Sequence, residues 1–233
     1  MDFPPFPGFR PEAFAFLRDL KANNEREWFK PRKATYDDEL KWPLQCLIAD
    51  ASRQAHERGL PVQGDPKKSA FRIYRDTRFS KNKAPYKTHV SGVLSRTGSK
   101  KEPGGVYIHI EPGNVFAGAG YWVPDSPLLR RWRTRMTDDP QAFLGMVADF
   151  EAHGFEMSYR DSLKRMPRCF EHAADTPIAD YLKWKSFFAM KTFTDAEAQS
   201  PAFTEQLVEL TAQTLPLLEF GWEIMDDMPA ATG

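Results

Sequence analysis

The order of hydrophobic periods along the chain predicts an α+β fold, with a central antiparallel meander sheet of about four or more strands. Apolar residues recur at helical spacing over the first sixty residues and again after residue 125. Between these regions the pattern is aromatic and β-branched, and in residues 105–111 it alternates strictly. The sheet is therefore expected to be flanked by N-terminal and C-terminal helices.

The N-terminal region begins with a predicted helix over residues 11–21, because Pro11 suits a first helical turn and apolar side chains follow at helical spacing. We expect Asn23 to cap the end of this helix and Asn24 to cap the start of the next. The next helical piece is short and carries Trp28.

A longer helix is predicted over residues 32–57, interrupted at Pro43 and ended by Gly59. Its apolar stripe consists of Tyr36, Leu40, Leu44, Leu47 and Ile48.

The middle of the chain has the period of β-strands. Four strands are predicted, over residues 71–75, 89–95, 105–111 and 115–122. Gly118 and Gly120 lie on one face of the last strand, where they would weaken pairing but allow another backbone or a ligand to approach closely.

The C-terminal region returns to a helical period after Pro124. Helices are predicted over residues 128–136, 140–152, 178–184 and 200–225, with a final strand over 185–193 and a short strand or loop within 155–170. No linker, repeat or low-complexity tract interrupts the chain. We therefore predict one domain over residues 1–233, helical over 1–60, with the sheet and a basic motif over 67–122, and mainly helical over 125–227.

The composition excludes several classes of protein. The 233 residues carry no net charge and 13% aromatic residues, which is untypical of a disordered chain. No apolar run is long enough for a transmembrane helix, and the first ten residues lack the pattern of a secretory signal. The two cysteines, Cys46 and Cys169, are too few for a disulfide framework and have no CxxC partner. We expect a soluble, cytoplasmic protein of bacterial type without membrane association.

The neutral total conceals a strongly uneven distribution of charge. Residues 67–101, the basic segment, hold eleven Lys and Arg side chains and one acid, whereas residues 192–233 hold eight acids and no Lys or Arg. Either the acidic C-terminal helix neutralises the basic segment internally, or the molecule presents a basic face to an anion.

The basic segment contains the motif R-x-x-R-D-x-R-F followed by N-K-x-x-Y. Planar guanidinium groups and lysines are the usual donors to phosphate or carboxylate ligands, and Asp76 can hold one guanidinium in a bidentate pair. We expect the motif to bind an anion through Arg72, Arg75, Arg78, Asn82 and Lys83.

Three functions remain open for this motif. The first is an enzyme or binding protein for a small phosphorylated metabolite or nucleotide, with proton transfer by His109, Tyr86 or Asp76. The second is a nucleic-acid or protein interaction module, and the third is a purely structural arginine–aspartate network. The oligomeric state is not predicted.

The same motif resembles the hallmark of the domain-of-unknown-function family DUF2461. The resemblance runs along the whole chain and includes Asn23-Asn24 with Trp28-Phe29, the strand around His109, residues 118–122 and residues 163–168. It implies an α+β protein without an established activity, and no catalytic residue carries over. After Pro167-Arg168 a glycine would be expected where this chain has Cys169, so a tight backbone turn is not expected there.

His109 lies in the alternating strand, on the face shared by Tyr107 and Glu111. It could act as a general acid or base near a bound anion, or be a half-exposed histidine bonded to a neighbour. The other histidines, His56, His89, His153 and His172, show no HxxxH or HExxH spacing. Residues 118–120 also lack the context of a dinucleotide loop, so we predict neither a metal nor a cofactor.

Overall fold

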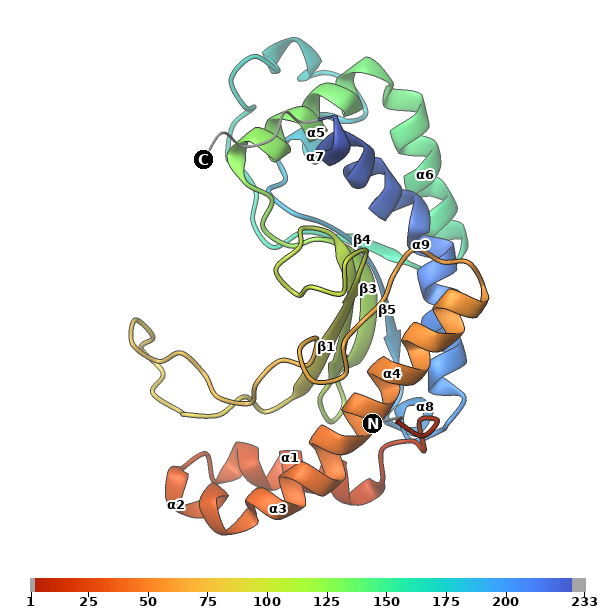
Figure 1. Ribbon diagram of the computed structural model, residues 1–233. Helices are drawn as coiled ribbons and strands as arrows, with labels where there is room; N and C mark the ends of the chain where they lie inside the picture. Colours follow the sequence, from red (N-terminus) through yellow and green to blue (C-terminus); the bar gives the residue numbers. More distant parts are fainter. Residues whose placement is uncertain (1–2, 228–233) are drawn as a thin grey trace. The chain divides into compact units, whose positions relative to one another are not determined.

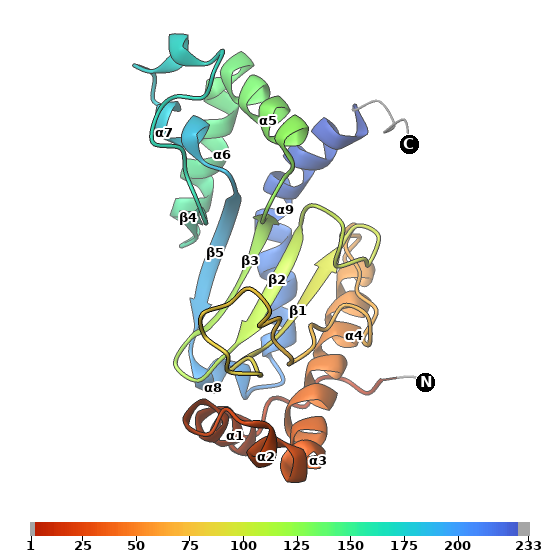
Figure 2. The ribbon, with the colours of Figure 1, turned by 90° about the vertical axis from the view of Figure 1, so that its left-hand side faces the viewer.

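The computed structural model describes residues 3–227 and confirms the α+β class (Figure 1). Within these residues, five antiparallel strands form one sheet in the order β1-β2-β3-β5-β4 (Figure 2). The strands are β1 (Val90–Ser95), β2 (Gly105–Ile110), β3 (Val115–Tyr121), β4 (Glu156–Ser158) and β5 (Phe187–Phe193). The first three are consecutive in the chain and form the predicted meander.

The chain divides into two compact units that each combine several segments. Unit 1 comprises Met1–Glu102, Val106–Ala117 and Thr192–Thr211, and unit 2 comprises Pro103–Gly105, Gly118–Lys191 and Ala212–Gly233. The single domain therefore stays a prediction. None of the helices within residues 3–227 is both long and apolar enough to cross a membrane.

The helices of the first sixty residues follow the predicted order. They are α1 (Pro11–Ala22), α2 (Arg26–Phe29), the 3-10 turn η1 (Lys30–Arg32), α3 (Lys33–Tyr36), the π turn η2 (Asp37–Lys41) and α4 (Trp42–Glu57). Pro11 lies in the first turn of α1, and Phe14, Leu17 and Leu20 are buried on one face, as the spacing predicts. Helix α4 packs against β1.

Pro43 restarts the helix rather than kinking it. It lies in the first turn of α4, where the first N–H groups of a helix have no intrahelical acceptor, so its missing N–H costs little. The irregular π turn η2 comes directly before this restart. Gly59 then has φ +71° and donates its N–H to the His56 carbonyl, which ends the helix as predicted.

The prediction of a strand over residues 71–75 is wrong, because the backbone of this segment changes its hydrogen-bonding partner halfway. Its start pairs with β1, where the Phe71 N–H donates to the Ser91 carbonyl at 2.9 Å. Its end pairs with a different segment, where the Arg75 N–H donates to the Pro85 carbonyl at 2.9 Å. Isolated bridges form instead of a ladder, so the motif arginines do not share strand faces.

Gly118 and Gly120 of β3 allow the close approach that the sequence predicts, and the approaching group is the backbone of β5. A Cβ atom at Gly120 would lie 2.0 Å from the Phe187 carbonyl oxygen. A Cβ atom at Gly118 would lie 2.6 Å from the Ala189 carbonyl oxygen. The glycines therefore serve the joining of β3 to β5 in unit 2.

The C-terminal elements are α5 (Ser126–Asp138), α6 (Pro140–Ala152), η3 (Glu171–Ala173), α7 (Ala179–Lys183), α8 (Asp195–Ala198) and α9 (Phe203–Asp226). Asp125 and Asp139 cap α5 and α6 by accepting backbone N–H groups. The core of unit 2 is aromatic: the Trp132 ring stacks on Phe187 with centroids 4.6 Å apart. The tight turn not expected at Cys169 is present, because this exposed residue has φ +73°.

Candidate functional site

The arginine motif forms a loop that projects from the rest of unit 1 (Figure 1). Tyr74 and Tyr86 form an antiparallel bridge at its base, so residues 74–86, the basic loop, close on themselves. The middle of this loop has no sheet partner and lies at its far end.

The base of the basic loop is held by Asn24 and Phe29 of the N-terminal region. The Asn24 side chain accepts from the Tyr86 N–H and donates to the Tyr86 carbonyl, both at 3.0 Å. The Tyr86 ring stacks on Phe29 at 4.2 Å and is 5% exposed. Asn24 is therefore not the expected helix cap. Tyr86 has a packing role, and its burial raises the pKa of its phenol.

Asp76 and Arg78 form the predicted bidentate pair. The Arg78 guanidinium donates to both carboxylate oxygens, at 3.1 and 2.7 Å, and the Arg78 N–H donates to the same group at 3.2 Å. These bonds lower the pKa of Asp76 to about 2. The carboxylate is thus ionised near neutral pH, where it stabilises the loop through these bonds and is a poor proton donor.

Three other motif residues bond within the basic loop. Arg75 donates to the Ala84 carbonyl at 3.1 Å, Lys83 donates to the Thr77 carbonyl at 2.9 Å, and the Asn82 side chain accepts from the Ala84 N–H at 2.9 Å. These bonds fix the shape of the loop. The Arg75 guanidinium bonds a backbone carbonyl and not an internal carboxylate.

The far end of the basic loop exposes an aromatic ring among cations. Phe79 is 95% exposed, and the Arg78 guanidinium lies 5.8 Å from the centre of its ring. Tyr74, at the base, is 49% exposed. The exposed basic side chains of residues 67–101 are Lys67, Lys68, Arg72, Arg78, Lys81, Lys83, Lys100 and Lys101.

A second group of cations surrounds Phe71, beside the basic loop. The ammonium groups of Lys87 and Lys100 lie 5.2 and 5.6 Å from the Phe71 ring centre. Burial, with the charges of Arg72 and Lys100, lowers the pKa of Lys87. The positive charges are therefore crowded here, and an added anion would relieve their repulsion.

Three acids of α9, Glu205, Glu209 and Glu223, pair with arginines outside the motif. Arg58 at the end of α4 pairs with Glu205 at 3.5 Å and with Glu209 at 3.1 Å. Arg135 of α5 pairs with Glu223 at 2.9 Å. These pairs involve three of the eight acids of residues 192–233 and do not use Arg72, Arg75 or Arg78.

A different cluster joins β1 and β2 at their neighbouring ends. His89 directly precedes β1, His109 is in β2, and Glu111 follows β2. One ligand atom from each side chain lies within 4.8 Å of the other two. His109 is 7% exposed, so it is buried rather than half-exposed, and its Nδ1 lies 3.2 Å from the Tyr107 hydroxyl.

The electrostatics of this cluster follow from burial and from neighbouring charge. Burial, with the charges of His109 and Lys87, lowers the pKa of His89 to about 4. Burial also lowers the pKa of His109, while Glu111 acts in the opposite direction. Both imidazoles are therefore neutral at pH 7.

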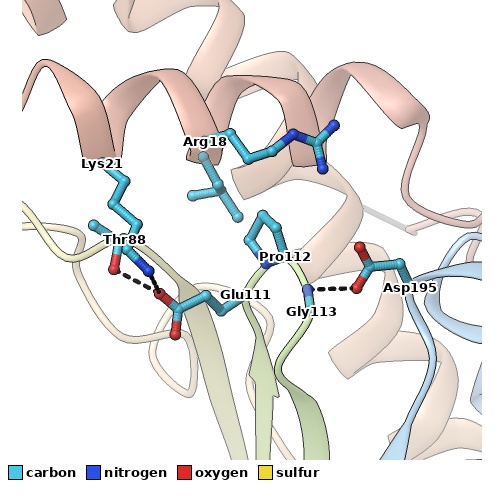
Figure 3. A pocket seen from close by; sticks show the side chains of 8 residues that line it. Arg18, Lys21, Thr88, Glu111, Pro112, Gly113 and Asp195 are labelled. Atoms are coloured by element: carbon cyan, nitrogen blue, oxygen red, sulfur yellow. Dashed lines mark hydrogen bonds and ion pairs between the residues drawn. The ribbon is translucent and has the colours of Figure 1, made fainter.

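A pocket of about 310 Å³ lies beside the cluster (Figure 3). The Glu111 carboxylate accepts from the Thr88 hydroxyl at 2.8 Å and lies 3.7 Å from the Lys21 ammonium. Figure 3 shows both contacts, and on the far side of the pocket Asp195 accepts from the Gly113 N–H at 2.9 Å. The lining residues are Leu17, Arg18, Lys21, Thr88, Glu111, Pro112, Gly113 and Asp195.

The structure thus separates residues that the sequence analysis considered together. Apart from Arg72, which lies just before it, the motif residues lie in the basic loop, whereas the contacts of His109 are with Tyr107, Glu111, His89 and Phe116. The grouping of His89 with His109 and Glu111 was not predicted, since no sequence spacing marks it.

These features define an α+β protein with a projecting basic loop. The family model described as "Conserved hypothetical protein (DUF2461)" matches residues 12–220, and the chain belongs to this family, which confirms the resemblance noted in the sequence. No curated protein matches the chain, and no solved structure matches it.

Proposed function

We propose that the chain binds single-stranded nucleic acid through the basic loop. The observation that carries this proposal is Phe79, whose side chain is 95% exposed at the far end of a loop rich in cations. Proteins that bind single strands combine exposed aromatic rings, on which bases stack, with Lys and Arg side chains along the phosphates. A single exposed ring is common on protein surfaces, but Phe79 lies beside the Arg78 guanidinium at the end of a cationic loop, where it is available to a stacked base.

The charge of the basic segment supports the same function. Of its eleven cations, Arg78 pairs with the segment's single acid, Asp76, Arg96 pairs with Glu102 at 3.5 Å, and Lys68 lies 4.0 Å from Asp65. Arg75 bonds a carbonyl. Glu205 and Glu209 of α9 pair with Arg58, and Glu223 pairs with Arg135. A strand of phosphates would supply counter-charges to the exposed cations, such as Lys67, Arg72 and Lys81, and release bound salt ions.

An extended ligand fits these observations better than a small phosphorylated metabolite. A small ligand needs a concave site in which polar groups converge. The pocket of about 310 Å³ is lined by none of the motif residues. The bonds of Arg75, Asn82 and Lys83 fix the loop instead of pointing donors into a common space.

The test is fluorescence anisotropy with a labelled thymidine oligonucleotide of about twenty nucleotides, long enough for the usual site sizes. We expect binding that weakens steeply with salt. Phe79→Ala should reduce affinity about 5- to 150-fold at every salt concentration, because a lost stacking contact does not change the number of phosphates bound.

A charge variant separates the phosphate contacts from stacking. The double variant Arg72→Ser/Lys81→Ser removes two exposed cations and should lower the slope of log affinity against log salt by about 1.4. Arg130→Ser/Arg131→Ser, on exposed positions of α5, removes the same charge and should leave the slope unchanged. An equal salt slope in the two double variants would contradict the proposal. Tighter binding of thymidine monophosphate than of the oligonucleotide would also contradict it.

A further inference from the structure

The ends of β1 and β2 in unit 1 hold three side chains of the kinds that bind transition metals. We propose that His89, His109 and Glu111 form a binding site for one divalent metal ion of the zinc type. The argument rests on the positions of their ligand atoms, all within 4.8 Å of one another, and is independent of nucleic-acid binding.

His109 provides the decisive observation. Its Nε2 atom is buried and makes no hydrogen bond, and it lies 3.5 Å from Glu111 Oε2. A buried polar atom without a partner costs free energy, and such an atom in a native protein calls for an explanation. A metal ion between Nε2 and the carboxylate would satisfy the lone pairs of both.

The second ring nitrogen of His109, Nδ1, has an oxygen partner, as histidine ligands of metals usually do. Nδ1 lies 3.2 Å from the Tyr107 hydroxyl, and the ring stacks on Phe116 with centroids 4.5 Å apart. Histidine ligands generally donate their second N–H to an oxygen, which fixes the ring and directs the other nitrogen to the metal. With Nδ1–H donating to Tyr107, the lone pair of Nε2 points to the cluster.

Glu111 is divided between structural contacts and the cluster. Its Oε1 accepts from the Thr88 hydroxyl at 2.8 Å and lies 3.7 Å from the Lys21 ammonium (Figure 3). Its Oε2 is the oxygen near His109 and also accepts weakly from the Asn114 amide at 3.3 Å. The carboxylate is therefore held in place through one oxygen while the other remains directed at the histidine.

The geometry agrees with zinc chemistry. Two ligand atoms on a tetrahedral Zn²⁺ ion lie about 3.3–3.4 Å apart, given bond lengths of about 2.0–2.1 Å. The distance of 3.5 Å between His109 Nε2 and Glu111 Oε2 is close to this value. The His89 ring, 4.2 Å from the His109 ring between centroids, supplies the third ligand.

Two histidines and one glutamate leave a coordination position open. Sites with three protein ligands of this kind hold water or a substrate in the fourth position, unlike closed structural zinc sites. Of the three ligands, Glu111 also lines the neighbouring pocket of about 310 Å³. The site is thus of the type that exchanges its fourth ligand.

The test is a titration of the chelator-treated full chain with Co²⁺ at pH 7.5, followed by its visible absorption, and then displacement of Co²⁺ by Zn²⁺. We expect saturation at one ion per chain. Glu111→Gln and His89→Gln, which preserve side-chain volume approximately, should abolish the stoichiometric signal. Tyr107→Phe should weaken binding about 10- to 100-fold by removing the partner of Nδ1.

The controls separate a lost ligand from a lost fold. His172→Ala removes an exposed histidine of η3 and should leave the Co²⁺ signal unchanged. Far-UV circular dichroism and metal-free melting establish that each variant is folded. Absence of a stoichiometric signal in the unaltered chain, its persistence in folded Glu111→Gln and His89→Gln, or an equal loss in His172→Ala would overturn the proposal.

Discussion

The Asp76 carboxylate accepts three hydrogen bonds from Arg78, and these bonds lower its pKa to about 2 from an ordinary value of 3.8. Arg78→Ala removes the two guanidinium donors, so we expect the pKa of Asp76 to rise toward 3.8. A pH titration of the carboxyl ¹³C resonance by NMR measures this change. A pKa that stays near 2 in the variant would mean that the backbone, rather than the Arg78 side chain, stabilises the carboxylate.

Cys169 has φ +73°, a left-handed conformation that costs a side-chain-bearing residue about 1–2 kcal/mol. Glycine adopts it freely but loses more entropy on folding. Cys169→Gly should therefore raise the free energy of unfolding by about 0.5–1 kcal/mol in urea denaturation. Cys169→Ser retains the strain and should remain within about 0.5 kcal/mol of the parent. Equal stability of the two variants would show that the turn is not strained.

At the level of elements, β3 can lie beside β5 in unit 2 because Gly120 has no side chain. A Cβ atom there would lie 2.0 Å from the Phe187 carbonyl oxygen, a backbone atom that cannot rotate away. We expect Gly120→Ala to destabilise the fold by at least about 1–3 kcal/mol, measured by urea denaturation.

Gly145 of α6 is the matched control, since it is exposed and a Cβ atom there would meet nothing within 4 Å. Gly145→Ala should stabilise by about 0.5–1 kcal/mol through its higher helix propensity. If Gly120→Ala were as stable as the parent chain, β5 could shift away from β3 at little cost.

The elements also show what the sequence could and could not predict. Helices α1, α4 and α9 and the meander were predicted because their hydrophobic periods are long and regular. Residues 71–75 have the composition of a strand, but a strand also needs one continuous partner, and here the partner changes between Ser91 and Pro85. Asn24 has the composition of a helix cap, yet its side chain bonds to Tyr86, sixty-two residues away. Both differences arise from distant contacts that local patterns do not contain.

The same reason limits prediction of the candidate sites. The basic loop was found because its cations are contiguous in sequence. His89 and Glu111 lie at the ends of two neighbouring strands. The connection between two strands can have any length, so the spacing of these residues carries no signal. Motifs such as HxxxH are recognisable only because one helix turn fixes the separation of the two ligands.

For the whole molecule, the formal net charge of zero at pH 7 predicts weak retention by a cation exchanger, whereas the uneven distribution predicts strong retention. Eight cations of the basic segment are exposed to solvent, and three acids of α9 pair instead with Arg58 and Arg135. Arg72→Ser/Lys81→Ser and Arg130→Ser/Arg131→Ser have identical net charge. We expect the first variant to elute from a cation exchanger at lower salt than the second, because adsorption follows the concentrated basic face rather than the total charge. Equal shifts would show that retention follows total charge and that the basic segment is not an open face of the protein, whatever ligand it binds.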